Sequence, residues 1–90
     1  MDQAIAESAD RAARRTRKHA ESLSSALTRT AKVLERSAIL AEAHALRYEQ
    51  TGRSGAAAKE RQVAEHARET AQRARVHAAE WLDRSVGRKQ

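Results

Sequence analysis

Two glycines close together interrupt an otherwise unbroken helical pattern, and this interruption constrains the fold more than any other feature. The chain has three glycines and no proline, and Gly52 and Gly55 lie in the stretch 50–55. Gly52 can adopt the left-handed conformation that ends a helix, and Ser54 can cap the next one. A short loop between two long helical segments is typical of an antiparallel helical hairpin. The sequence therefore predicts a turn at 50–55.

The residues on either side of the turn favour helices. Alanine occurs 21 times, and Tyr48 and Trp81 are the only aromatic residues. Residues that favour strands are few outside helical spacing. We expect one all-α domain over 1–90, with helical segments at about 3–22, 23–51 and 56–86. The serines between 22 and 25 allow a break. Segment 3–22 is then either an extension of the next helix or a third helix that folds back.

Segment 23–51 has the clearest heptad pattern, which is typical of a coiled coil. Ala26, Val33 and Leu40 lie beside this stripe and widen it into a core-facing surface. The stripe itself consists of Leu23, Leu27, Thr30, Leu34, Ser37, Ala41, His44 and Tyr48.

Segment 56–86 carries a seam of small residues with the same spacing: Ala57, Ala64, Ala67, Ala71, Ala74, Ala78, Trp81 and Ser85. A loop centred between residues 53 and 54 places Leu40 and Ala41 opposite Ala67 and His66. The stems of three arginines are expected to lie across alanines of 23–51, with the guanidinium groups in water. These arginines are Arg61, Arg68 and Arg75. The residues expected to hold the fold are Leu23, Leu27, Leu34, Leu40, Val63 and Trp81.

The predicted core is thin for a chain without cysteine, and self-association is the usual remedy for small scaffolds. We expect a homo-oligomer, most simply a dimer that forms a four-helix bundle. Ile39, Ala43 and Leu46 fall on the back of 23–51, and Val76 is a similar outlier on 56–86. They are either ordinary surface aliphatics or a second interface. In the second case, replacing Ile39 and Leu46 by Glu weakens assembly.

No arrangement typical of an enzyme or a metal protein occurs. The residues three positions before the four histidines are Thr16, Ala41, Val63 and Ala74, so the Glu-x-x-His pattern of di-metal bundles is absent. Phosphate-binding glycine motifs and His-Glu-x-x-His are also missing. We expect no catalysis, no cofactor and no metal. The sequence favours a protein–protein interaction module, such as a scaffold, an adaptor or a regulatory coiled coil. Near the seam, His44 and His77 are either polar fillers or part of a pH-sensitive interface.

A run of five cations at 11–18 supports the main alternative, weak and non-specific nucleic-acid binding. No aromatic, Asn or Gln residue lies among these cations to stack on or read bases. The run consists of Arg11, Arg14, Arg15, Arg17 and Lys18. Segment 3–22 has too small an apolar face for a membrane surface, and no stretch is apolar enough to span a membrane. A cytoplasmic location is the default expectation.

Overall fold

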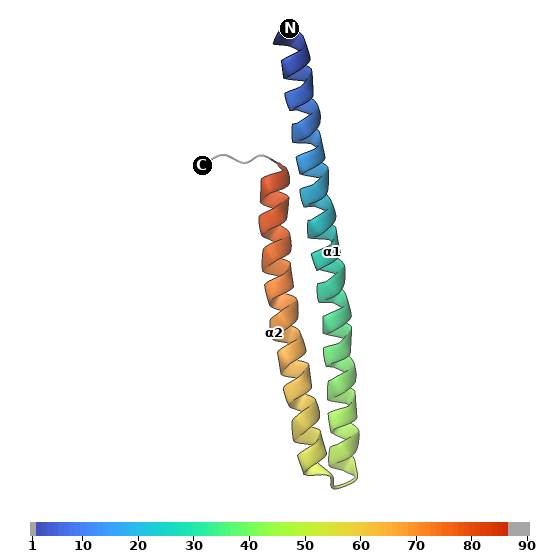
Figure 1. Cartoon of the computed structure of the whole chain (residues 1–90). Coiled ribbons are helices and arrows are strands. Elements are labelled where there is room, and N and C mark those ends of the chain that lie inside the picture. Colours follow the sequence, from blue (N-terminus) through green and yellow to red (C-terminus); the bar gives the residue numbers. More distant parts are fainter. Residues whose placement is uncertain (1, 87–90) are drawn as a thin grey trace.

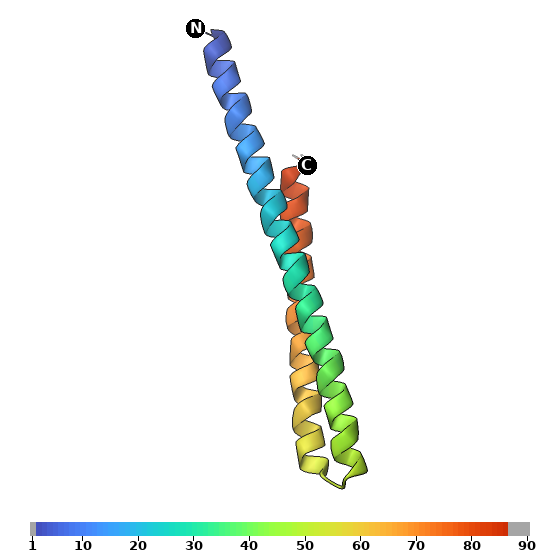
Figure 2. The same ribbon diagram turned by 90° about the vertical axis from the view of Figure 1, so that its right-hand side faces the viewer.

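The computed structural model describes residues 2–86, and these residues form an antiparallel pair of α-helices. α1 runs from Asp2 to Gln50 and α2 from Ser54 to Ser85. Figure 1 and Figure 2 show the helices side by side, joined by the short turn at one end of a rod. The longest extent of the rod is 77 Å. The all-α helical hairpin predicted from the sequence is confirmed.

α1 is one continuous helix, so the predicted segments 3–22 and 23–51 are not separated by a break. Ser24 is buried, and its hydroxyl donates a hydrogen bond of 2.8 Å to the carbonyl oxygen of Ala78 on α2. The hydroxyl of Thr28 donates to the carbonyl oxygen of Ser24 at 3.0 Å. The serines therefore have partners within and across the helices, and helix caps are not needed to explain them.

Residues 2–19, which we call the overhang, extend α1 beyond the end of α2. Figure 1 and Figure 2 show this part of α1 projecting past the last turn of α2. Every residue of the overhang is exposed, whereas Ala20 is buried. The alternative in which residues 3–22 fold back as a third helix is therefore wrong.

The turn ends α1 with a Schellman motif. The amide of Arg53 donates to the carbonyl oxygen of Tyr48 at 2.7 Å, and the amide of Gly52 donates to that of Glu49 at 3.1 Å. These are the two backbone bonds of the motif, and Gly52 has the positive φ of 76° that it requires. The guanidinium group of Arg53 lies 5.1 Å from the centre of the Tyr48 ring. The predicted role of Gly52 is confirmed.

The predicted cap at Ser54 is wrong. Arg53 occupies the cap position of α2 and makes no capping hydrogen bond through its side chain, while Ser54 is already helical. A cap at Ser54 would make Gly55 the first residue of α2. The tight turn of the Schellman motif instead lets α2 begin at Ser54.

We expect Gly52→Ala and Gly55→Ala to have opposite effects on stability. A Cβ atom at either glycine meets no atom within 4 Å, so only the backbone conformation differs. Alanine at position 52 must adopt a positive φ, which costs roughly 1 kcal/mol. Alanine at position 55, inside α2, is favoured over glycine by up to about 1 kcal/mol. Urea unfolding followed by circular dichroism measures both changes, and equal shifts would contradict the assignment of the turn.

The two helices meet along a seam made almost entirely of alanine. On α2 the predicted seam is confirmed: its six alanines and Ser85 are buried, and Trp81 is half-buried. On α1 the seam is shifted by one residue from the prediction at four positions. Ser24, Ala31, Ala38 and Ala45 face α2 in place of Leu23, Thr30, Ser37 and His44. Two alanine clusters form along the seam, Ala38, Ala41, Ala64 and Ala67 in one and Ala31, Ala71 and Ala74 in the other.

The shift changes which large side chains support the fold. Leu34 packs against both alanine clusters, and Leu27 packs against one of them. Leu40 and Val63 are 58% and 55% exposed, so their predicted role in the core is wrong. The alanines of α2 hold the helix axes close together, and at that distance small residues of α1 fit the seam better than Leu40 does.

Candidate functional site

One flank of the seam is closed by three ion pairs between the helices. Arg75 donates two hydrogen bonds to the carboxylate of Glu35, at 2.8 and 2.7 Å. Arg68 lies 2.6 Å from a carboxylate oxygen of Glu42, and Arg61 pairs with Glu49. Each member is seven residues from the next on its own helix, which is the charge pattern of a coiled coil. We call this side the ion-pair flank.

The ion-pair flank adds acidic partners to the predicted role of the three arginines. Their guanidinium groups bind carboxylates, and the arginine side chains remain 40–52% exposed to water. Sequence reasoning missed the acidic partners, although a signal was present, because the two sets share the same spacing of seven residues. The partners are Glu35, Glu42 and Glu49.

The ion pairs predict a loss of stability in acid. The hydrogen bond from Arg75 lowers the pKa of Glu35, and the hydrogen bond from Arg68 lowers the pKa of Glu42. Since each pKa is lower in the hairpin than in the unfolded chain, the stabilisation is present above the unfolded-state value of about 4.3. It is lost as the pH falls through the folded-state pKa, because the unfolded chain then binds more protons. We expect the melting temperature to fall below about pH 4, as measured by circular dichroism.

The matched control for the acid prediction is the double variant Glu35→Gln with Glu42→Gln. Its melting temperature at pH 7 is expected to lie below that of the unaltered chain and to change less on acidification. An equally steep fall in the double variant would show that other carboxyl groups cause the acid sensitivity.

The opposite flank of the seam carries no formal charge between Leu23 and His77, and we call it the uncharged flank. Its residues occupy the other row beside the seam, at the same spacing of seven. Leu23, His44, Ala56 and Thr70 are half-buried, and the rest are exposed. His77 lies with Nδ1 3.1 Å from a carboxylate oxygen of Glu80. The flank comprises Leu23, Thr30, Ser37 and His44 on α1 and Ala56, Val63, Thr70 and His77 on α2.

The candidate interface expected from the sequence does not form one surface. Ile39 and Leu46 lie on the outside of α1 next to the ion-pair flank, and Ile39 shares a shallow depression with Glu35 and Arg68. Val76 follows Ala74, which clusters with Ala31, so it lies about 15 Å along the rod from Ile39. Ala43 is exposed between Ile39 and Leu46. A role for these residues in assembly stays a prediction.

The overhang has a cationic face. Four of its five cations line one surface depression, and Arg14 also lies 3.8 Å from a carboxylate oxygen of Asp10. The fifth cation, Arg17, is exposed but does not line this depression. The four are Arg11, Arg14, Arg15 and Lys18. The structure thus brings most of the predicted nucleic-acid contacts together on a helix that α2 does not cover.

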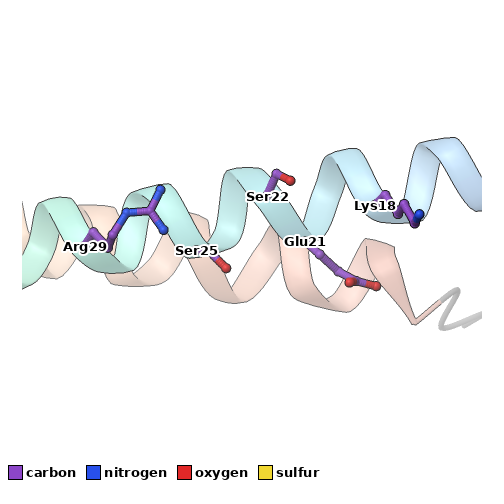
Figure 3. Close-up of a pocket in the computed structure, with 5 residues that line it drawn as sticks. All are labelled: Lys18, Glu21, Ser22, Ser25 and Arg29. Carbon is purple, nitrogen blue, oxygen red and sulfur yellow. The ribbon is translucent and has the colours of Figure 1, made fainter.

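A second depression lies where α1 passes the end of α2, and its polar groups do not converge (Figure 3). Ser22 and Ser25 point to opposite sides of the helix, and Glu21 points away from Arg29. Lys18 and Arg29 sit at opposite ends of the depression. All five lining residues come from α1, so no second element closes over them.

Over residues 2–86, no three side chains of the types that ligate metals gather into one group. Neither described helix has a stretch apolar enough to cross a membrane.

Comparison with models of protein families, with curated proteins and with solved structures finds no match to this chain.

Proposed function

We propose that the protein is a non-catalytic helical interaction module that acts as a homo-oligomer, with a dimer as the simplest form. One observation carries the proposal. The core of the hairpin consists of alanines, and within residues 2–86 no large side chain is fully buried. At the same time, nine large aliphatic side chains in this part of the chain are about half exposed or more.

A single hairpin with an alanine core buries little apolar area. Burying a methyl group contributes roughly 0.8 kcal/mol, whereas a buried leucine or valine contributes about 1.5–3 kcal/mol. Small domains are marginal even with larger cores, and oligomerisation is a common way to stabilise them. A second copy, or another helical protein, would cover the aliphatic side chains that the hairpin leaves in water.

The proposal predicts the mass of the protein in solution. Light scattering is expected to give twice the mass of one chain at both low and high salt, since apolar contacts are not screened by salt. Adding a short DNA duplex of random sequence is expected to leave this mass unchanged. A monomer at every concentration tested would contradict self-association.

The second candidate function is weak, non-specific nucleic-acid binding through the overhang. The observation that favours it is the shared surface of Arg11, Arg14, Arg15 and Lys18, on a helix free of α2. Parallel contacts from one helix face to successive phosphates would make binding depend steeply on salt.

Replacing all five cations of the overhang by Gln tests this function. If it is correct, a DNA-dependent shift in mobility at low salt is present in the unaltered chain, vanishes at high salt and is lost in the five-fold variant. The control replaces five exposed cations outside the overhang by Gln, so the change in net charge is the same; they are Lys32, Arg36, Arg47, Lys59 and Arg73. Equal loss of binding in both variants would show that net charge alone causes binding.

A further inference from the structure

The uncharged flank does not stop where α2 stops. On α1, its row of Leu23, Thr30, Ser37 and His44 continues at the same spacing into the overhang through Thr16 and Ala9. The neighbouring row contains Ala6, Ala13 and Ala20. The next two residues of this row, Leu27 and Leu34, belong to the seam with α2. α1 therefore presents a second heptad stripe along almost its whole length, of which α2 covers only part.

The stripe needs a partner most in the overhang. Most of the stability of a helix in a protein comes from packing of its amphipathic face, and the overhang has no such contact with α2. Arg11, Arg14, Arg15 and Lys18 project from the other side of the overhang, so a helix packed on the stripe would not bury them. The overhang thus has a charged face that can remain in solvent and an uncharged face wide enough to pack against another helix.

The uncharged flank offers a groove that fits such a helix. Val33 and Leu40 of α1 and Val63 of α2 are each more than half exposed along it. A shallow depression of about 420 Å³ lies on α1 between Thr30, Val33 and Leu34, and Arg29 also lines it. A helix lying here would contact α1 and α2 together and would cover these aliphatic side chains.

We infer that the partner is a second copy of this chain, with the two α1 helices antiparallel, their ends aligned and their uncharged stripes in contact. The inference rests on the proposed function and specifies its geometry. α1 spans residues 2–50, so its midpoint is Ala26. The overhang of each copy then lies in the groove of the other, beside the half of the hairpin that contains the turn.

The sizes of the facing residues support this arrangement. Within one row of α1 beside the stripe, Ala12 and His19 precede the midpoint and Val33 and Leu40 follow it. The outermost members of the row, Ile5 and Arg47, lie opposite each other in the same register. Antiparallel pairing sets Ala12 opposite Leu40 and His19 opposite Val33, at equal distances from Ala26. A large residue meets a smaller one at both steps, as close packing requires. Parallel pairing would set Leu40 against Leu40 and leave Ala12 facing Ala12.

The symmetry of the arrangement also favours a second copy over another protein. The contact uses the same surface on both chains and closes after two copies. Both overhangs are covered, and neither copy retains an uncovered groove. Since the α1 helices overlap fully, the dimer would be about as long as one hairpin, whose longest extent is 77 Å.

Cysteine cross-linking tests the predicted contacts directly, because the chain has no cysteine of its own. Ala26→Cys is expected to give a disulfide-linked dimer under mild oxidation. The double variant Ala12→Cys with Leu40→Cys is expected to do the same, whereas either single variant is not. Within one chain these two positions are about 42 Å apart along the same helix, so an internal disulfide cannot form. Ala79→Cys, on the outer face of α2, is the control and should remain uncross-linked.

Two adjacent exposed residues provide a matched pair for affinity. Leu40→Glu places a charge in the proposed contact, and Ile39→Glu places the same charge beside the ion-pair flank. Leu40→Glu is expected to weaken dimerisation roughly tenfold or more, as measured by sedimentation, and Ile39→Glu to leave it nearly unchanged.

The outcomes separate this inference from the proposed function. A dimer that is weakened by Ile39→Glu but not by Leu40→Glu, with no cross-link at Ala26, would overturn the antiparallel arrangement and favour the interface expected from the sequence. Self-association itself would then stand. An unaltered chain that is monomeric would contradict both.

Discussion

We expect Ala71→Glu to unfold the hairpin and Ala79→Glu to leave it folded. Ala71 is 1% exposed and lies in one alanine cluster with Ala31 and Ala74. A carboxylate at this position would be desolvated with no cation of the ion-pair flank free to reach it, and a buried unpaired charge costs several kcal/mol. The seam is narrow, so the helices must separate to let the side chain reach water. We expect a loss of at least about 3 kcal/mol, which is comparable to the roughly 3–5 kcal/mol that the core of a small scaffold supplies.

Ala79 makes this experiment a controlled one. It lies on the same helix, is exposed, and undergoes the same chemical change. Any effect of glutamate on helix propensity or net charge is therefore shared by the two variants. A substitution at an exposed position usually changes the free energy of unfolding by no more than about 0.5 kcal/mol. Thermal unfolding followed by circular dichroism at one protein concentration compares the two variants. If both lose stability equally, the buried seam lies on another face of α2.

Leu34→Ala has the second largest expected effect, a loss of about 2 kcal/mol in the free energy of unfolding. Leu34 is half-buried and is the one described leucine that packs against both alanine clusters. Its removal leaves a gap between them that the small neighbouring side chains cannot fill. The expected value is at the lower end for leucine because part of the side chain already contacts water.

Leu82→Ala is the control for the change at Leu34. Leu82 is 51% exposed near the end of α2, so the same truncation should cost less than about 0.5 kcal/mol. Urea unfolding at equal protein concentrations is the appropriate measurement, since assembly links stability to concentration. A larger effect at Leu82 than at Leu34 would show that the core lies nearer the open end of the hairpin.

Local chemistry accounts for the parts of the fold that could be predicted. Gly52 is the residue best able to adopt the positive φ of the turn, and the absence of proline leaves both flanking segments helical. On α2 only one row combines small residues with unbroken heptad spacing, so its seam could be assigned from the sequence. Of the candidate site residues, four cations of the overhang line one depression because they are near neighbours on one helix, and their role stays a prediction.

On α1 the sequence offered two overlapping rows, and local rules could not choose between them. One possible stripe includes Leu40 and the other includes Ala38, and a rotation of α1 about its axis exchanges one stripe for the other at the seam. The choice depends on how close α2 approaches, and that distance is set only when the alanines of both helices meet. The larger side chains indicated the wrong row, because in most helices leucine marks the buried face more reliably than alanine does.

The sequence by itself determined that this protein is a helical hairpin, where it turns, and which face of α2 is buried. These features follow from backbone conformation and from periodicity within one segment. Only the tertiary structure decided the rotation of α1, the pairing of Arg61, Arg68 and Arg75 with acidic partners, and the continuation of α1 past α2. Each of these depends on the distance and register between two helices, which no single stretch of sequence encodes. The same packing left the uncharged flank open, and this surface is where we place the second copy.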